Sequence, residues 1–155
     1  MSDWRLPDAA ATEAAGAALA PLLKPGDIVA LHGELGAGKT SFARGVLAAL
    51  GLAEEAPSPS FAIVQAYAPP DVRLPVWHVD LYRLDSPEEA VELGLDEVLA
   101  DGVLLIEWPE RLGDRLWPDT LHLTLETTSD GARRLTWVTP LAWEPRWPPS
   151  KSRFR

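Results

Sequence analysis

The sequence contains no cysteine, no asparagine and one glutamine, and only three of its 155 residues are lysines. The lack of cysteine excludes disulfides, thiolate metal sites and a catalytic thiol. No apolar run approaches about 18 residues, a length typical of a membrane-spanning helix, and the N-terminus lacks the charged and apolar regions of a signal peptide. We therefore expect a cytoplasmic protein with no membrane partner.

The formal net charge is −9 at pH 7. Proteins that hold nucleic acid set clusters of lysine and arginine against the phosphate backbone. The acidic balance argues against a large nucleic-acid footprint, so a role in RNA chemistry would be expected to act through a protein partner. The length, the 46% of hydrophobic residues and the seven tryptophans indicate one globular domain.

The run Gly33-Glu34-Leu35-Gly36-Ala37-Gly38-Lys39-Thr40 fits the pattern G-x-x-x-x-G-K-[ST], the phosphate-binding loop of nucleotide hydrolases. The apolar residues 27–32 before it predict a buried strand. Residues 41–50 after it are rich in alanine and leucine and end at Gly51, which is typical of a helix. This order of strand, loop and helix is the context that the motif requires.

The residue types of the loop suit a polyphosphate. Glycines allow positive φ angles and let successive backbone N–H groups surround the anion, towards which the new helix points its positive end. We expect Lys39 to reach the β- and γ-phosphates of the nucleotide and the Thr40 hydroxyl to bind Mg²⁺. The expected nucleotide-binding residues are Glu34, Leu35, Gly36, Ala37, Gly38, Lys39, Thr40 and Ser41, although the Glu34 side chain is not expected to contact phosphate closely.

The base is predicted by elimination. GTPases read guanine with an Asn-Lys-x-Asp element, and this chain has no asparagine. Its one glutamine, Gln65, lies in a predicted strand, so a Ras-like glutamine that positions water is not expected. An adenine nucleotide is therefore the expected ligand.

The pattern of apolar runs and turns predicts an α/β fold of three layers like that of P-loop NTPases. Its central sheet is expected to be mixed, mostly parallel and extended by antiparallel hairpins. The expected strands are residues 4–6, 27–32, 61–67, 76–80, 103–107, 121–125 and 134–138, and the expected helices run from residue 8 or 12 to about 23, over 41–50, from 86 to about 94, and over 96–100. Residues 1–143 are expected to form the domain, and residues 144–155 a proline-rich, basic tail that is poorly ordered.

Two acids follow apolar strands, and hydrolysis needs an acid near Mg²⁺ and a group that positions water. Glu107 ends the cleaner apolar run, so it is favoured as the carboxylate on the Mg²⁺ side, directly or through water. Asp80 would then orient the attacking water or respond to the γ-phosphate. The reverse assignment remains open, and so does the simpler interpretation that each acid caps a loop at the end of a strand.

Three further residues are candidates of lower specificity. Ser60 lies in the loop after the phosphate-loop helix, where a hydroxyl can reach the γ-phosphate and Mg²⁺, although Ser-Pro-Ser is also an ordinary turn. Trp108 could stack near the site or form an aromatic lid on the core. His78 could face the same cleft as Asp80, but a single histidine on a strand is more often packed in the core.

Six segments of the chain resemble the TsaE (YjeE) family of bacterial P-loop ATPases. They are Thr12 to Ala20, Gly33 to Gly45, Ser58-Pro59-Ser60-Phe61, His78-Val79-Asp80-Leu81-Tyr82-Arg83-Leu84, Leu93-Gly94-Leu95-Asp96-Glu97 and Ile106-Glu107-Trp108-Pro109-Glu110-Arg111. The resemblance covers residues 10 to 115 in the family's order. The segments that begin at His78 and at Glu107 are far more specific than the phosphate loop.

The resemblance implies an ATPase required for the threonylcarbamoyl modification of adenosine 37 in tRNAs that read codons starting with A. Such a protein would not make the modification itself. It would bind a TsaD–TsaB complex, which ATP hydrolysis helps to reset between turnovers, and would meet tRNA only indirectly.

The resemblance also assigns Thr40 and Glu107 to Mg²⁺ and Asp80 to hydrolysis, and it places the helix around Thr12 near the adenine. Ser60 departs from the family's usual threonine but keeps the hydroxyl. Glu34 stands where the family often has aspartate or another residue.

Two other function classes remain. A small-molecule kinase also uses a phosphate loop, but it needs an acceptor pocket and usually a lid that carries arginine, and the arginines here are scattered. A nucleotide-gated binding module would bind without useful turnover. Because no finger-like arginine is evident within the chain, we expect slow hydrolysis alone and a partner that completes the site.

Overall fold

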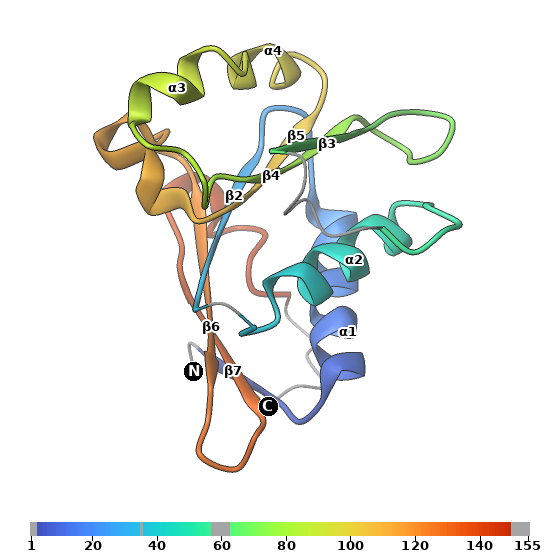
Figure 1. Ribbon diagram of the computed structural model, residues 1–155. Helices are drawn as coiled ribbons and strands as arrows, with labels where there is room; N and C mark the ends of the chain where they lie inside the picture. The colour runs from blue at the N-terminus through green and yellow to red at the C-terminus, as the bar shows by residue number, and fades with distance from the viewer. Residues whose placement is uncertain (1–2, 35, 57–62, 150–155) are drawn as a thin grey trace.

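The computed structural model of the chain describes residues 3–34, 36–56 and 63–149. These residues form one seven-stranded sheet with helices on both faces (Figure 1). The strands are β1 (Asp3–Leu6), β2 (Ile28–His32), β3 (Val64–Tyr67), β4 (Val76–Asp80), β5 (Val103–Glu107), β6 (Leu121–Thr127) and β7 (Arg133–Val138). The helices are α1 (Ala9–Leu19), η1 (Ala20–Leu22), α2 (Lys39–Ala49), α3 (Pro87–Val91), α4 (Leu95–Val98), η3 (Pro109–Arg115) and η4 (Leu141–Trp143).

The strand order is β1-β7-β6-β2-β5-β4-β3. The four central strands β6, β2, β5 and β4 run parallel to one another. The outer strands are antiparallel: β3 pairs with β4, and β7 pairs with β6 and β1. This arrangement confirms the mixed sheet with a parallel centre and both hairpins. The carboxyl ends of the parallel strands lie at one edge of the sheet, so Asp80 and Glu107 lie there together with the start of the phosphate loop.

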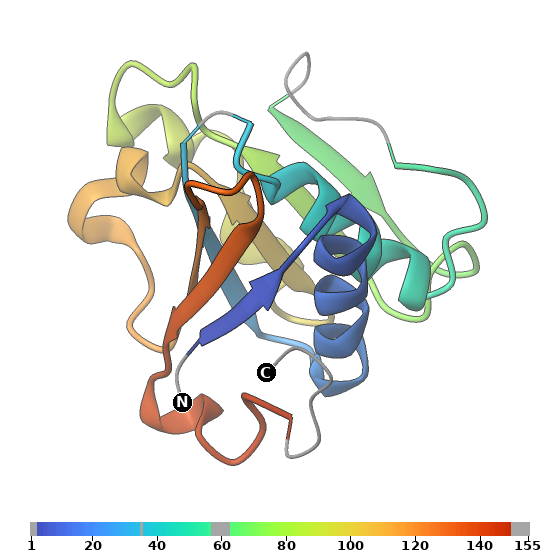
Figure 2. The same ribbon diagram turned by 90° about the horizontal axis from the view of Figure 1, so that it is seen from below.

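The parallel strands are buried on both faces, which explains their unbroken apolar runs. On β5, Val103 and Leu105 join the core under α1 and α2, whereas Leu104 and Ile106 join the core under α3, α4 and η3. In Figures 1 and 2, α1 and α2 lie side by side along one face, and α3 and α4 lie across the other. The predicted three layers are therefore present.

Helices α1 and α2 pack very closely because glycines lie at their contact, where a larger side chain would hold the two backbones apart. A Cβ atom on Gly45 would lie 1.9 Å from the carbonyl oxygen of Glu13, and one on Gly16 would lie 2.1 Å from that of Phe42. Only glycine fits at both positions. The close packing brings the amino-terminal turn of α1 to the phosphate loop, where the Thr12 side chain lies beside Gly38.

The end of the chain corrects one expectation. Residues 144–149 are not a poorly ordered tail, because Trp147 is 1% exposed and its ring packs against Trp4 and Trp137 at centroid distances of 5.2 and 5.6 Å. Arg146 forms an ion pair with Asp27, with a 2.6 Å contact from Nη1 to Oδ2. The domain thus continues beyond residue 143. The prolines of this segment indicated disorder, but burial of the Trp147 ring outweighs that tendency. Residues 150–155 lie outside the described part.

No helix in the described part of the chain has the length and apolar character needed to cross a membrane.

Candidate functional site

The phosphate loop joins the carboxyl end of β2 to the first turn of α2. Gly33, Gly36 and Gly38 have φ angles of 146°, 80° and 105°, and Gly38 is the residue that caps α2. Residues with a Cβ rarely adopt such angles, so the glycines allow the path of this loop. The first N–H groups of α2 have no acceptor within the helix, which leaves them available to an anion.

Lys39 is 4% exposed and lies over the loop. Its Nζ donates a hydrogen bond to the carbonyl of Gly33 at 2.7 Å and lies 3.5 Å from the centroid of the Trp108 ring. Burial lowers the pKa of Lys39, and the nearby carboxylates of Glu107, Glu110 and Asp80 oppose that shift. The ammonium group is therefore placed at the loop among acids.

Glu107 lies next to the hydroxyl of Thr40. The Thr40 Oγ1 is 3.4 Å from Oε2 of Glu107, and the same oxygen is 2.6 Å from Nε2 of His78. The His78 and Glu107 side chains are 1% and 5% exposed. Since a carboxylate accepts, Nε2 of His78 is the donor, and it fixes the direction of the carboxylate. The buried Nδ1 of His78 has no hydrogen-bond partner among the described residues.

Asp80 is the direct neighbour of Glu107 across the parallel pair β4–β5. Its Oδ1 accepts a hydrogen bond from the backbone N–H of Tyr82 at 2.9 Å, and its charge acts on Lys39. Asp80 forms no hydrogen bond with Thr40 in the described structure. Two carboxylates thus lie side by side at the sheet edge, and that of Glu107 is the one beside the hydroxyl.

Trp108 is the one described residue other than glycine with a positive φ, at 59°. Non-glycine residues in this region are strained, and such strain is concentrated at functional sites. The ring contacts both Lys39 and Tyr82, with a centroid distance of 4.8 Å to the latter. It also packs on the core under α3, α4 and η3, so both interpretations of Trp108 describe part of its environment.

The other residues predicted for the site differ in where the structure places them. Thr12 is buried beside Gly38, and its hydroxyl donates to the carbonyl of Asp8 at 3.3 Å. Glu34 is exposed, and its carbonyl accepts from the N–H of Ala37, while Ser41 is half-buried in the first turn of α2. Leu35 and Ser60 lie outside the described residues.

Arg133 is a residue of the site that the sequence did not single out. It comes from β7, and its Nε and Nη2 donate to the carbonyls of Ala37 and Gly36 at 3.0 and 3.1 Å, while Nη1 donates to Gly131. In the described residues no carboxylate pairs with it. Because C=O and N–H point in opposite directions in a trans peptide, holding the Ala37 carbonyl also fixes the direction of the Gly38 N–H.

His32, the last residue of β2 before the loop, pairs with His122 of the neighbouring strand β6. Nε2 of His32 and Nδ1 of His122 are 2.8 Å apart, and the rings are stacked. Burial lowers the pKa of both histidines, and the neighbouring His122 lowers that of His32 further. Because one nitrogen must donate and the other accept, this contact requires that the two facing nitrogens are not both protonated.

Comparison with known proteins settles the family. The model of the family described as "Threonylcarbamoyl adenosine biosynthesis protein TsaE" matches residues 6–135. The chain belongs to the TsaE family. A TsaE protein of Bacillus subtilis is 36% identical over 136 residues, which are 87% of this chain and 84% of the relative, and one of Streptomyces coelicolor is 39% identical over 134 residues, 85% and 90% of the two chains.

A solved structure agrees with this assignment. The crystal structure of YdiB from Bacillus subtilis superposes with a TM-score of 0.73 at 33% identity, over 88% of this chain and 84% of that one. The TsaE relatives carry the name tRNA threonylcarbamoyladenosine biosynthesis protein. The stretch matched by the TsaE model contains every site residue from Thr12 to Arg133, so the resemblance seen in the sequence is confirmed at the level of family.

Proposed function

We propose that this chain binds and hydrolyses ATP with Mg²⁺ at the phosphate loop. Hydrolysis would serve the threonylcarbamoyl modification of adenosine 37 in tRNAs that read codons starting with A. The observation that supports it most is the grouping of Lys39, Thr40 and Glu107 around a glycine-rich loop at the carboxyl edge of parallel strands. Binding at this edge is the general rule for open α/β sheets.

The residues at the loop fit Mg²⁺ and a triphosphate. A hydroxyl and a carboxylate 3.4 Å apart supply two hard oxygen donors, and Mg²⁺ usually takes one or two protein oxygens and completes its shell with water and phosphate. When bound, the ion would neutralise charge that develops on the phosphates. Thr40 and Glu107 would hold it, and His78 would keep the Glu107 carboxylate oriented.

Each remaining side chain has a role in this proposal. Lys39 would leave the Gly33 carbonyl and bind the β- and γ-phosphates. Asp80 would accept a hydrogen bond from the attacking water and orient it. Thr12 would lie near the adenine, Trp108 would cover Lys39, and Ser60 would offer a hydroxyl to the γ-phosphate.

A TsaD–TsaB complex is the proposed partner. The net charge of −9 gives this chain no evident means of holding tRNA itself, so tRNA would be held by the partner proteins in the cytoplasm. No arginine other than Arg133 contacts the loop among the described residues, and Arg133 is engaged with loop carbonyls. Hydrolysis by the chain alone is therefore expected to be slow, and a partner would complete the site.

The test compares ATP hydrolysis by the purified chain with and without the cognate TsaD–TsaB complex. We expect a slow, Mg²⁺-dependent rate that rises when the complex is added. Binding of ATP without hydrolysis in either case would favour a nucleotide-gated module, and transfer of phosphate to a metabolite would favour a kinase. Either outcome would contradict the proposed ATPase.

The contacts of Arg133 lead to a prediction on affinity. Arg133→Gln removes the guanidinium that holds the Gly36 and Ala37 carbonyls, so the loop N–H groups lose their fixed direction. We expect ATP to bind about tenfold more weakly in isothermal titration, because hydrogen bonds of charged groups each contribute about 1.5–3 kcal/mol.

Arg134→Gln is the matched control for this prediction. Arg134 is the next residue of β7 and is exposed, and its ion pair with Asp3 is a long contact of 4.0 Å from Nε to Oδ2. Its loss should therefore leave the affinity for ATP unchanged. Wild-type affinity in Arg133→Gln would contradict the positioning role of Arg133.

A further inference from the structure

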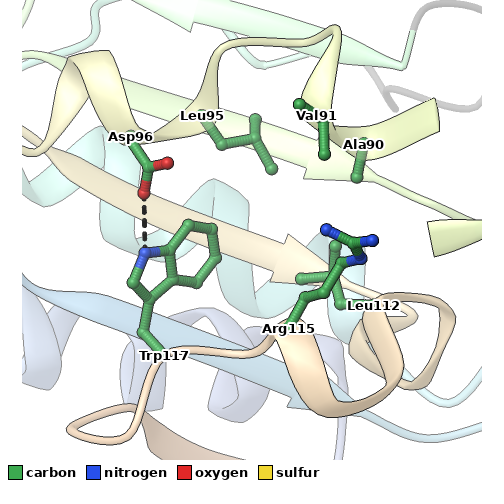
Figure 3. Close-up of a pocket in the computed structure, with 7 residues that line it drawn as sticks. All are labelled: Ala90, Val91, Leu95, Asp96, Leu112, Arg115 and Trp117. Atoms are coloured by element: carbon green, nitrogen blue, oxygen red, sulfur yellow. Dashed lines mark hydrogen bonds between the residues drawn. The ribbon is translucent and has the colours of Figure 1, made fainter. Parts of the chain in front are cut away.

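A hollow lies on the face of the sheet opposite α1 and α2. It has a volume of about 340 Å³, and Figure 3 shows its walls: one comes from α3 and α4, the other from η3 and the segment that follows it. A hydrogen bond of 2.8 Å from Trp117 Nε1 to Asp96 Oδ1 joins the two walls. The lining residues are Ala90, Val91, Leu95, Asp96, Leu112, Arg115 and Trp117. None of them belongs to the nucleotide site.

Three buried apolar side chains form the floor of this hollow. Ala90, Leu95 and Leu112 are 6%, 4% and 2% exposed, and they belong to the core under α3, α4 and η3. Val91 lies at the opening and is 65% exposed, one of the most exposed large apolar residues described. The volume is at the lower end of the range of about 300–1,000 Å³ in which proteins enclose a ligand or side-chain anchor.

The chain segment that forms the α3–α4 wall is acidic. Six exposed carboxylates lie on the 13-residue segment from Asp85 to Glu97, namely Asp85, Glu88, Glu89, Glu92, Asp96 and Glu97. Arg115 is the one cation among the lining residues, and it is paired with Glu88 at 3.4 Å. Glu89, Glu92 and Glu97 form no ion pair with any described residue. A hollow with an apolar floor and exposed carboxylates along one wall, here called the acidic rim, is complementary to an apolar side chain flanked by positive charges.

The hollow is also connected to the nucleotide site through the chain. Its wall η3 begins at Pro109, directly after Trp108, whose ring covers Lys39. Leu112, in the middle of η3, lines the hollow. A partner seated there would therefore contact the same short segment that contacts the phosphate loop.

We propose that this hollow is the docking surface for a partner protein. It takes an apolar side chain of the partner, from a segment that carries lysine or arginine on either side. This inference rests on the proposed function in one respect, because it identifies the partner as the TsaD–TsaB complex. The apolar anchor supplies most of the affinity, and the acidic rim speeds association and excludes acidic segments.

The test is a pair of matched valine substitutions. Val91→Lys places a long, positively charged side chain at the opening, whereas Val138→Lys makes the same change at a 70% exposed valine at the end of β7. We expect Val91→Lys to weaken binding of the cognate TsaD–TsaB complex at least about tenfold in surface plasmon resonance. Val138→Lys should bind as the wild type does. Neither valine is among the residues of the proposed nucleotide site, so ATP hydrolysis by the chain alone should not change.

A third variant separates charge from size. Val91→Glu introduces a side chain that also projects into the opening but repeats the sign of the rim. We expect Val91→Glu to weaken binding less than Val91→Lys does, and the difference to shrink at high salt because exposed charges are screened. Equal losses in both variants at low salt would overturn the acidic-rim part of the proposal.

The outcomes distinguish this inference from the proposed function. Wild-type chain that binds the complex, together with Val91→Lys that binds equally well, overturns the docking surface and leaves the ATPase intact. An equal loss in Val138→Lys also overturns it, because the effect would then be general. Wild-type chain that does not bind the complex at all overturns the partner assignment first, and the docking surface with it.

Discussion

Asp80→Asn is expected to lower the rate of ATP hydrolysis about 100-fold or more, while the affinity for ATP changes less than about twofold. Positioned acids and bases raise rates about 10²- to 10⁴-fold. Asparagine is neutral and therefore lacks the negative charge that orients the attacking water. The amide oxygen can still accept the hydrogen bond from the Tyr82 N–H, so the local turn should persist. Single-turnover hydrolysis and isothermal titration measure the two quantities.

Asp101→Asn is the control for this change, because Asp101 is exposed and precedes β5, at the opposite end of that strand from Glu107. It should hydrolyse ATP at the wild-type rate. If Asp80→Asn turned over normally, the water-orienting role would be wrong. Glu107 would then be the acid that orients water, which is the reverse assignment that the sequence left open.

Lys39→Ala is expected to weaken ATP binding about 10- to 100-fold. The reason is that a charge-assisted hydrogen bond contributes about 1.5–3 kcal/mol, and about 1.4 kcal/mol corresponds to a factor of ten. Lys39 is the one lysine at the loop, and its Nζ already lies within hydrogen-bond distance of Gly33. Titration with ATP in the presence of Mg²⁺ measures the change.

Lys24→Ala serves as the comparison for Lys39→Ala, since Lys24 is exposed in the turn before β2. Its removal should leave the affinity for ATP unchanged. A thermal melt of both variants is needed, because Lys39 also contacts the Trp108 ring. Wild-type affinity in a folded Lys39→Ala variant would show that the loop does not bind nucleotide through this lysine.

The parts of the site that could be predicted are those set by local sequence. The phosphate loop is a contiguous segment, and its glycines, lysine and threonine indicate their roles by spacing alone. The parallel strands were evident because β2 and β5 are apolar without interruption. The parallel pairing of β4 with β5 was not predicted, and it places Asp80 directly beside Glu107 at the carboxyl ends of the strands.

The contacts that could not be predicted join residues far apart in sequence. Arg133 holds Ala37 across 96 positions, and no motif surrounds it that would indicate a contact with the loop. The sequence favoured a packed histidine at position 78. The structure adds the hydrogen bond to Glu107, which depends on the register of β4 and β5.

Two differences from the predicted elements remain, at the end of the first helix and in the C-terminal tail. The first helix was expected to reach residue 23, but α1 ends at Leu19 and the chain tightens into the 3-10 turn η1, which contains Pro21. Proline lacks the N–H that would continue the α-helical pattern. The prolines and basic residues of the tail predict disorder. In the structure the Trp147 ring instead packs beside Trp4 and Trp137.

The most direct test is a crystal structure of the chain with Mg²⁺ and a non-hydrolysable ATP analogue. The account predicts the triphosphate within the loop of Gly33 to Thr40, Lys39 turned from the Gly33 carbonyl to the phosphates, and Mg²⁺ at the Thr40 hydroxyl and the Glu107 carboxylate, directly or through water. A loop that stays closed by Lys39 at saturating analogue, or a nucleotide bound elsewhere, would contradict it.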